Sequence, residues 1–122
     1  MQEAEKLAVK YNGVAFPWEG IGNVADADII INTTPVGRQG EEFPYIIENL
    51  EAKQKKYGKG NVVIFDVNYN HSGIPLLTEA KKLGVTVIDG LELLLQQGML
   101  QFKLYTGIKA PEVAMRESLK KL

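Results

Sequence analysis

Three apolar runs, each ending in a polar turn, constrain the fold of this chain more than any other feature of its sequence. Residues 29–31 are Ile-Ile-Ile before Asn-Thr-Thr-Pro-Val-Gly, residues 62–65 are Val-Val-Ile-Phe before Asp-Val-Asn-Tyr-Asn, and residues 85–88 precede Asp-Gly. Such runs are typical of buried parallel strands, whose carboxyl ends lie at one edge of a sheet. The three turns are therefore expected to share one crevice.

The remaining segments predict helices around these strands. Apolar residues at helical spacing predict helices over residues 2–11, 74–83, 90–105 and 110–122, and a weaker helical segment over residues 45–50. Gly13 and Gly84 act as helix stops, and Pro75 fits the first turn of its helix. Residues 14–18 predict a short strand, which Pro17 confines to a sheet edge or a strand end. This alternation predicts an α/β domain of three layers, with a mostly parallel sheet of about four strands.

The segment 90–105 carries apolar residues on two nearly opposite faces of a helix drawn at about 100° per residue. The first face, expected to pack on the sheet, consists of Leu91, Leu94, Leu95, Gly98, Phe102 and Tyr105. The second stripe consists of Leu93, Gln97, Leu100 and Leu104. A helix that is apolar on two faces is expected to be covered on both.

Composition places the chain among ordinary globular domains. Hydrophobic residues make up 45% and charged residues 24% of the 122 residues, and the formal net charge is -1. This balance argues against a nucleic-acid partner, and the absence of cysteine excludes disulfides, thiol catalysis and zinc-thiolate sites. No apolar run approaches transmembrane length, and no secretory signal or metal site is recognised. A cytoplasmic protein without a membrane partner is expected.

The turn after residues 29–31 is the first candidate for ligand contact. Asn32 supplies a side-chain amide, Thr33 and Thr34 supply hydroxyls, and Pro35 exposes backbone at the carboxyl end of the predicted strand. This set could hold the ribose or the phosphates of a dinucleotide. The alternative is an ordinary strand-to-loop turn, because Asn, Thr, Pro and Gly are all turn residues.

The other two turns carry further candidates, each with a structural alternative. Asp66 is expected to accept hydrogen bonds from loop amides, and Tyr69 either faces the crevice or packs at a strand end. Asp89 is placed to cap the following helix, and Gly90 would let the backbone approach a planar ligand closely. Gln97, the polar member of the second stripe, either contacts a ligand or lies on the helix surface.

Taken in order, the three turns resemble the C-terminal half of shikimate dehydrogenase, where N-A-T-P-x-G, D-x-x-Y-N and D-G-L-x-x-L-x-x-Q follow one another. The resemblance implies a Rossmann-like domain and an NADP-dependent reduction of 3-dehydroshikimate to shikimate, in aromatic amino-acid biosynthesis. It places residues 32–35, the backbone of Val67 and Gly90 against the cofactor. It places Tyr69 and Gln97 on the small-molecule substrate.

The resemblance also implies parts that are not expected in this chain. No Gly-rich phosphate loop is expected ahead of the strands, and the family's catalytic Lys and Asp belong to a separate N-terminal domain. Residues 1–122 are therefore expected to be the C-terminal part of a nucleotide-binding domain, without its first βαβ unit, without a catalytic residue and without activity alone. Two alternatives stay open: a non-catalytic Rossmann-type binding or regulatory module, and a quinate/shikimate dehydrogenase that uses NAD.

Strand order leads to a prediction about association. In the order 3-2-1-4-5-6, the strands of this chain correspond to the third through sixth. The strand at residues 27–32 would then have one unpaired edge, which recruits a partner. Either residues 14–18 pair with this edge, or two chains associate through it or through the second stripe, giving a homo-oligomer.

Overall fold

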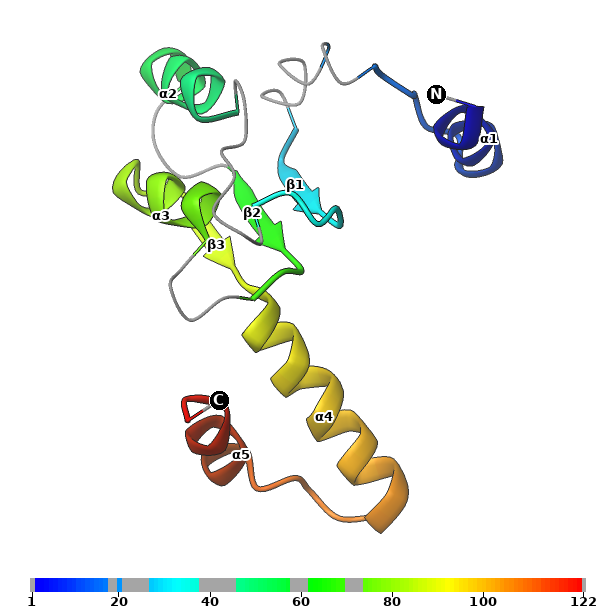
Figure 1. Cartoon of the computed structure of the whole chain (residues 1–122), viewed down its shortest axis with the longest axis vertical. Coiled ribbons are helices and arrows are strands. Elements are labelled where there is room, and N and C mark those ends of the chain that lie inside the picture. The colour runs from blue at the N-terminus through cyan, green and yellow to red at the C-terminus, as the bar shows by residue number, and fades with distance from the viewer. Residues whose placement is uncertain are drawn as a thin grey trace.

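The computed structural model describes residues 2–17, 20, 27–37, 46–57, 62–69 and 74–121. Its sheet has three strands, β1 (Ile29–Asn32), β2 (Val63–Asp66) and β3 (Thr86–Ile88), all parallel and in the order β1-β2-β3 (Figure 1). Helix α2 (Ile46–Tyr57) connects β1 to β2, and helix α3 (Pro75–Lys82) connects β2 to β3. The predicted α/β class and the parallel sheet are confirmed.

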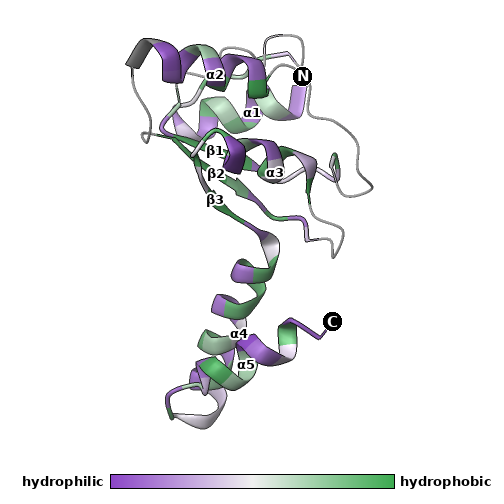
Figure 2. Ribbon diagram, turned by 90° about the vertical axis from the view of Figure 1, so that its left-hand side faces the viewer, coloured by the Kyte–Doolittle hydropathy of each residue, from purple (hydrophilic) through white to green (hydrophobic). Residues whose placement is uncertain are grey.

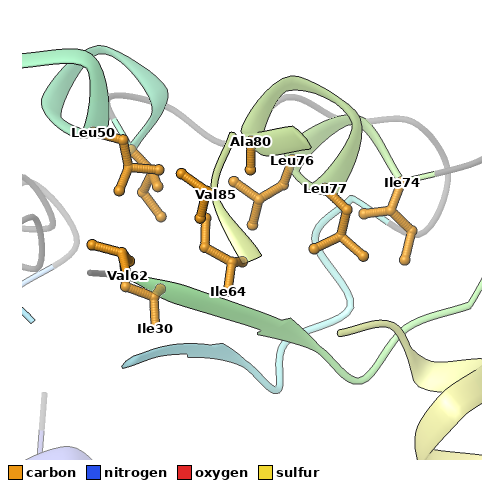
Figure 3. Close-up of a cluster of buried hydrophobic side chains, with 10 residues drawn as sticks. Ile30, Leu50, Val62, Ile64, Ile74, Leu76, Leu77, Ala80 and Val85 are labelled. Atoms are coloured by element: carbon orange, nitrogen blue, oxygen red, sulfur yellow. The ribbon is translucent and has the colours of Figure 1, made fainter. Parts of the chain in front are cut away.

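The hydrophobic core lies between one face of the sheet and the helices α2 and α3 (Figure 3). Ile64 at the centre of β2 pairs in register with Ile30 and Val87, and its side chain has no exposed surface. Leu50 from α2 and Ala80 from α3 are equally buried. Each large side chain in this cluster contributes about 1.5–3 kcal/mol by leaving water.

The opposite face of the sheet is open along β1. Ile29 and Ile31 alternate with buried Ile30 and remain 59% and 55% exposed. The described residues thus form two packed layers where three were expected, because no described helix covers these two side chains. This edge strand also lacks a second neighbour within the described ranges.

The predicted strand over residues 14–18 is wrong for residues 14–17, and Trp18 lies outside the described residues. Val14 and Phe16 are exposed. The carbonyl of Pro17 accepts from the amide of Gly20 at 2.9 Å, three residues along the chain, and not from a neighbouring strand. The described sheet therefore has three strands, and its edge is not paired with residues 14–17 as proposed. Association of two chains stays a prediction.

One of the next two helices has the predicted length, and the other is longer than predicted. Helix α1 (Gln2–Tyr11) ends as predicted, with Asn12 in the left-handed region and the Gly13 amide bonded to Ala8 at 2.7 Å. Helix α2 runs for 12 residues, although only a weak segment over residues 45–50 was predicted. Ile46 and Leu50, buried one turn apart, hold its first half on the core.

Helix α4 (Gly90–Thr106) begins and ends as its sequence indicates. The carboxylate of Asp89 accepts a hydrogen bond from the Glu92 amide at 2.9 Å, and Gly107 terminates the helix with a φ of 74°. From this start the helix runs away from the sheet (Figure 1). Figure 2 shows hydrophobic residues along the length of the helix. No described helix is both long and apolar enough to cross a membrane.

The predicted packing of α4 on the sheet is wrong. Buried Leu95 and its neighbour Leu94 instead form an apolar hollow with helix α5 (Glu112–Leu119), and Met115 lies against Gly98. Tyr105, at the far end of the same face, is exposed. The second stripe is not covered as expected, since its leucines Leu93, Leu100 and Leu104 are all exposed. A helical wheel gives the faces of a helix but not the direction of its axis.

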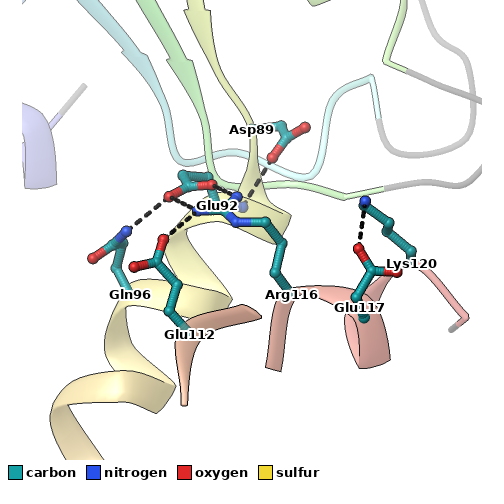
Figure 4. A network of polar contacts seen from close by, with 7 residues as sticks. All are labelled: Asp89, Glu92, Gln96, Glu112, Arg116, Glu117 and Lys120. Atoms are coloured by element: carbon teal, nitrogen blue, oxygen red, sulfur yellow. Dashed lines mark hydrogen bonds and ion pairs between the residues drawn. The ribbon is translucent and has the colours of Figure 1, made fainter. Parts of the chain in front are cut away.

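An ionic cluster joins α5 to the first turns of α4 (Figure 4). The Arg116 guanidinium donates to both carboxylate oxygens of Glu92, at 2.6 and 3.3 Å, and to Glu112 at 3.1 Å. The Gln96 amide donates to Glu92 at 2.8 Å. The Arg116 hydrogen bonds, followed by that of Gln96, lower the pKa of Glu92 below its ordinary value, and the Glu92 carboxylate raises the pKa of Arg116.

This cluster predicts that the packing of α5 on α4 weakens in acid. A carboxyl group whose pKa is lowered by folding stabilises the packed state above its unfolded pKa, and loses that contribution as the pH falls through the folded pKa. The Met115 methyl NMR signal, which reports the contact with Gly98, should therefore change below the ordinary titration range of glutamate. Arg116→Gln should abolish this transition and Lys120→Gln should keep it. A Met115 signal that ignores pH in the native chain would contradict the prediction.

Candidate functional site

The three turns singled out in the sequence do meet at one end of the sheet. The amide of Val67 donates to the carbonyl of Asn32 at 3.0 Å, which joins the ends of β1 and β2. The amide of Gly90 donates to the carbonyl of Asn68 at 3.0 Å, which joins the end of β2 to the start of α4. Residues 32–37, 66–69 and 89–92 therefore lie together at one end of the sheet, as the parallel strand order predicted, and they are the candidate site.

Both the oxygen and the nitrogen of the Asn32 side-chain amide form hydrogen bonds that hold the loop after β1. Its oxygen accepts from the amide and the hydroxyl of Thr34, at 2.9 and 2.8 Å, and its nitrogen donates to Val36 at 3.1 Å and to Asp66 at 2.8 Å. The residue is 4% exposed. The Asn32 side chain is thus occupied within the chain and holds the loop that follows.

Among the described residues of this loop, 33–37, the exposed ones are Thr33 and Pro35. Thr34 is half-buried, and its hydroxyl donates to Asn32 and accepts from the Val36 amide at 3.3 Å. Thr33 and Pro35 are therefore the residues of the loop whose side chains are open to a ligand.

Asp66 is fully buried at the end of β2 and accepts three hydrogen bonds. They come from the side-chain amide of Asn32, the backbone amide of Asn68 and the side-chain amide of Asn68, each at 2.8 Å. The prediction that Asp66 accepts loop amides is confirmed. Its carboxylate serves the loops and has no exposed surface from which to act as a base.

Gly90 is buried against the backbone of the second loop. A Cβ atom at this position would lie 2.3 Å from the carbonyl oxygen of Val67, and 2.6 and 2.8 Å from the carbonyl oxygen and carbon of Asn68. The close approach expected of Gly90 is therefore made to the chain's own backbone. Residue 90 must be glycine for α4 to start beside the end of β2.

The two predicted substrate residues lie in different surroundings. Tyr69 is 52% exposed at the mouth of a small hollow that is lined further by Ile74, Leu77, Thr78, Lys81, Asp89 and Leu91. Gln97 lies exposed on α4, seven residues and about 10 Å along the helix axis from Gly90. The structure thus brings Asn32, Thr33, Thr34, Pro35, Val67, Tyr69 and Gly90 together and places Gln97 farther out.

Two features of the site region lay outside the sequence-based predictions. Asn68 received no role, although it contacts all three segments; an amide side chain between Asp66 and Tyr69 was the available signal. Residues 20–25, Gly-Ile-Gly-Asn-Val-Ala, have the G-x-G-x-x-A spacing of a phosphate loop. That fingerprint requires a strand before it and a helix after it. Here residues 14–17 are not a strand, and residues 21–26 lie outside the described residues.

The chemistry of the three segments suits an uncharged, planar ligand end. Residues 32–37, 66–69 and 89–92 offer hydroxyl, amide and backbone donors and contain no Lys or Arg. Their carboxylates, on Asp66, Asp89 and Glu92, all accept hydrogen bonds from within the chain. The uncharged donors fit a nicotinamide and its ribose, whereas a pyrophosphate calls for cations or free amides at a helix N-terminus. At the N-terminus of α4 the amide of Glu92 already donates to the carboxylate of Asp89. Among the described residues no three His, Cys, Asp or Glu side chains gather as a metal site would require.

The parallel strand order β1-β2-β3, with a helix between consecutive strands, is a Rossmann-like α/β arrangement, and the candidate site lies at the carboxyl ends of its strands. Residues 90–120 match the family model described as the shikimate 5'-dehydrogenase C-terminal domain. The NADP(+) shikimate dehydrogenase of Maridesulfovibrio salexigens is 38% identical over 120 residues, which are 96% of this chain and 41% of that protein. The corresponding enzyme of Methanobrevibacter smithii is 39% identical over 101 residues, 83% of this chain and 34% of that protein. The chain belongs to the shikimate dehydrogenase family.

Solved structures lead to the same family. Shikimate 5-dehydrogenase from Thermus thermophilus in complex with NADP(H) and shikimate superimposes with a TM-score of 0.75 at 27% identity, over 98% of this chain and 42% of that one. Quinate dehydrogenase from Corynebacterium glutamicum in complex with NAD gives a TM-score of 0.73 at 26% identity, over 98% and 41% of the two chains. The chain thus spans about two fifths of the length of the relatives that it matches.

Proposed function

We propose that this chain forms the nicotinamide side of an NADP-dependent dehydrogenase that interconverts shikimate and 3-dehydroshikimate in the cytoplasm. The observation that carries the proposal is the joining of three strand ends into one site with uncharged donors, in a chain of this family. Residues 1–122 would be the C-terminal part of the nucleotide-binding domain. The isolated chain is expected to turn over no substrate, because hydride transfer is coupled to proton transfer by an acid or base. The family's catalytic Lys and Asp, which would supply it, are not expected in these residues.

Each segment would have its own task. Thr33, Thr34 and Pro35 would lie against the ribose, and the backbone of Val67 and Gly90 would lie beside the nicotinamide. Bound NADP supplies the hydride acceptor. Tyr69 and Gln97 would hydrogen-bond the hydroxyl or carboxylate groups of the substrate and so orient its reacting carbon.

One second candidate has specific support. The similar quinate dehydrogenase of Corynebacterium glutamicum was solved in complex with NAD, which supports NAD as an alternative cofactor and quinate as an alternative substrate for this chain. A non-catalytic module remains the other alternative. For association, we propose a homo-oligomer formed either through the unpaired edge of β1, beside which Ile29 and Ile31 are exposed on the open face of the sheet, or through the exposed second stripe of α4.

In a complete enzyme containing this chain, Tyr69→Phe and Gln97→Ala are expected to raise the KM for shikimate more than the KM for NADP. Each change removes a hydrogen bond to a polar substrate, worth about 0.5–3 kcal/mol. Steady-state kinetics with each substrate varied in turn measures both constants. Tyr105→Phe and Gln101→Ala, matched changes at exposed positions of α4, should leave both constants unchanged. Unaltered shikimate kinetics in the first pair would assign Tyr69 and Gln97 to other roles.

The proposal is tested on the chain itself by titrating NADP into isotope-labelled protein and following the backbone amide NMR signals. The expected shifts concentrate on Thr33, Thr34, Val67 and Gly90, with weak affinity. NAD and shikimate titrated separately distinguish the candidate ligands. Shifts confined to α1 or α5, or none at any of the four residues, would contradict the proposal.

A further inference from the structure

We propose that Asn68 is the positioning residue that holds the three segments of the candidate site in one geometry. The inference rests on the proposed function for its ligand, and on the contacts of Asn68 for its mechanism. It assigns a role to a residue that touches neither the nicotinamide nor the substrate in that proposal.

The hydrogen bonds of Asn68 reach every segment of the site. Its side-chain nitrogen donates to the carbonyl of Thr34 at 2.8 Å, in the loop after β1. The same nitrogen and the backbone amide both donate to one carboxylate oxygen of Asp66, each at 2.8 Å, at the end of β2. Its carbonyl accepts from the amide of Gly90 at 3.0 Å, at the start of α4.

The two donor protons of the Asn68 side chain suit the acceptors around it. The amide nitrogen has two protons, which reach the two near acceptors on Thr34 and Asp66, both at 2.8 Å. A third acceptor, the carbonyl of Val36, lies farther away at 3.5 Å. An apolar side chain of equal size would leave the Thr34 carbonyl without this donor, and would remove one of the three donors from buried Asp66. A half-buried polar group that loses its partner favours a different loop position in which water can replace that partner.

The Asn68 backbone is also the surface against which α4 begins. The carbonyl oxygen and carbon of Asn68 would lie within 2.8 Å of any Cβ on Gly90, so the two backbones are in direct contact. A shift of Asn68 therefore moves the start of α4. Because the Asn68 side chain also holds Thr34, one change at this residue displaces both walls of the proposed nicotinamide site.

The experiment compares isotope-labelled chains with Asn68→Leu, Asn68→His and Asn68→Ala, using NADP as the probe. Leucine keeps the branching and the number of side-chain heavy atoms of asparagine and removes both donor protons, whereas histidine can place its Nδ1–H where the asparagine Nδ2 lies. Asn68→Leu is expected to raise the Kd for NADP about tenfold or more, and to shift the amide signals of Thr34 and Gly90 without ligand. Asn68→His should restore most of the affinity. The matched control Gln101→Ala, an exposed amide on α4, should bind like the native chain.

The possible outcomes separate the two claims. The inference is overturned if folded Asn68→Leu binds NADP as the native chain does, or if its Thr34 and Gly90 amides keep their native shifts. If the native chain itself shows no NADP binding, the proposed function fails, and the ligand-free Thr34 and Gly90 signals still decide the role of Asn68. Should Asn68→Leu not fold, Asn68→Ala takes its place, and restored signals in Asn68→His against lost ones in Asn68→Ala support the inference.

Discussion

Replacing Gly90 with alanine is expected to destabilise the chain by about 3 kcal/mol or more, or to prevent its folding. The added Cβ would lie 2.3 Å from the Val67 carbonyl oxygen and within 2.8 Å of two Asn68 atoms. All three atoms belong to the backbone, so no side chain can rotate to relieve the overlap. Relief requires moving the start of α4 away from the end of β2, which breaks the hydrogen bond from Gly90 to Asn68. Urea unfolding followed by circular dichroism measures the loss.

Gly98→Ala is the matched control, since it makes the same change in the same helix. The nearest atom to its added Cβ is the terminal methyl of Met115 at 3.3 Å, which can move. Alanine also favours a helix interior by about 1 kcal/mol over glycine. The control should therefore be neutral or stabilising. Equal unfolding midpoints for the two variants would contradict the packing described at Gly90.

Removing the Asp66 carboxylate is expected to cost about 3 kcal/mol of unfolding free energy in Asp66→Ala. This carboxylate has no exposed surface and is the acceptor for the side-chain amides of Asn32 and Asn68 and for the Asn68 backbone amide. Alanine leaves these donors buried or half-buried without their acceptor. The ends of β1 and β2 would lose the side-chain link between them, so the amide signals of both loops should also broaden or shift.

Asp28→Ala provides the comparison, because Asp28 is an exposed acid at the start of β1 and its backbone hydrogen bond to Val63 is kept. Its unfolding free energy should change by less than about 0.5 kcal/mol. A small effect of Asp66→Ala, similar to that of the control, would show that the buried hydrogen bonds around Asp66 do not stabilise the fold.

The elements that could be predicted from the sequence are those whose signals are local. The β-branched run through Ile30 and the run through Ile64 each indicated a buried strand, and both strands lie in the predicted order. Asp89 was expected to cap the long helix, and its carboxylate does so. Pro75 and Gly84 bounded α3 at the predicted places. Capping and strand patterns depend on neighbours in the chain, so one sequence is enough to find them.

The predictions that failed concern elements whose packing partners lie far away in the chain. Helix α2 continues beyond its weak pattern because Leu50 is buried by the core, which the local sequence does not reveal. Residues 14–17 have strand composition but meet no strand edge. The apolar face around Leu95 was assigned to the sheet, whereas α5 covers it. Periodicity identified the apolar face correctly in that case and could not name its partner.

In the candidate site, too, local features could be predicted from the sequence and tertiary contacts could not. The meeting of the three turns and the loop-accepting role of Asp66 followed from residue types and strand ends, whereas Gly90 was expected to approach a ligand. Asn68 and the contact of Gly90 with the Val67 and Asn68 backbone did not follow from residue types, because both arise only when β2 and α4 are placed side by side. The hydrogen bonds that position the site are therefore tertiary, although the residues expected to face a ligand are marked in the sequence.

The central claim is that the ends of β1 and β2 and the start of α4 form one nicotinamide-binding site. Intermolecular nuclear Overhauser effects between the nicotinamide ring protons of NADP and the isotope-labelled chain test this claim most directly. We expect contacts from the ring to Val67 and Gly90, with ribose contacts to Thr33. Ring contacts confined to the hollow between α4 and α5, or none to the three strand-end segments, would contradict it.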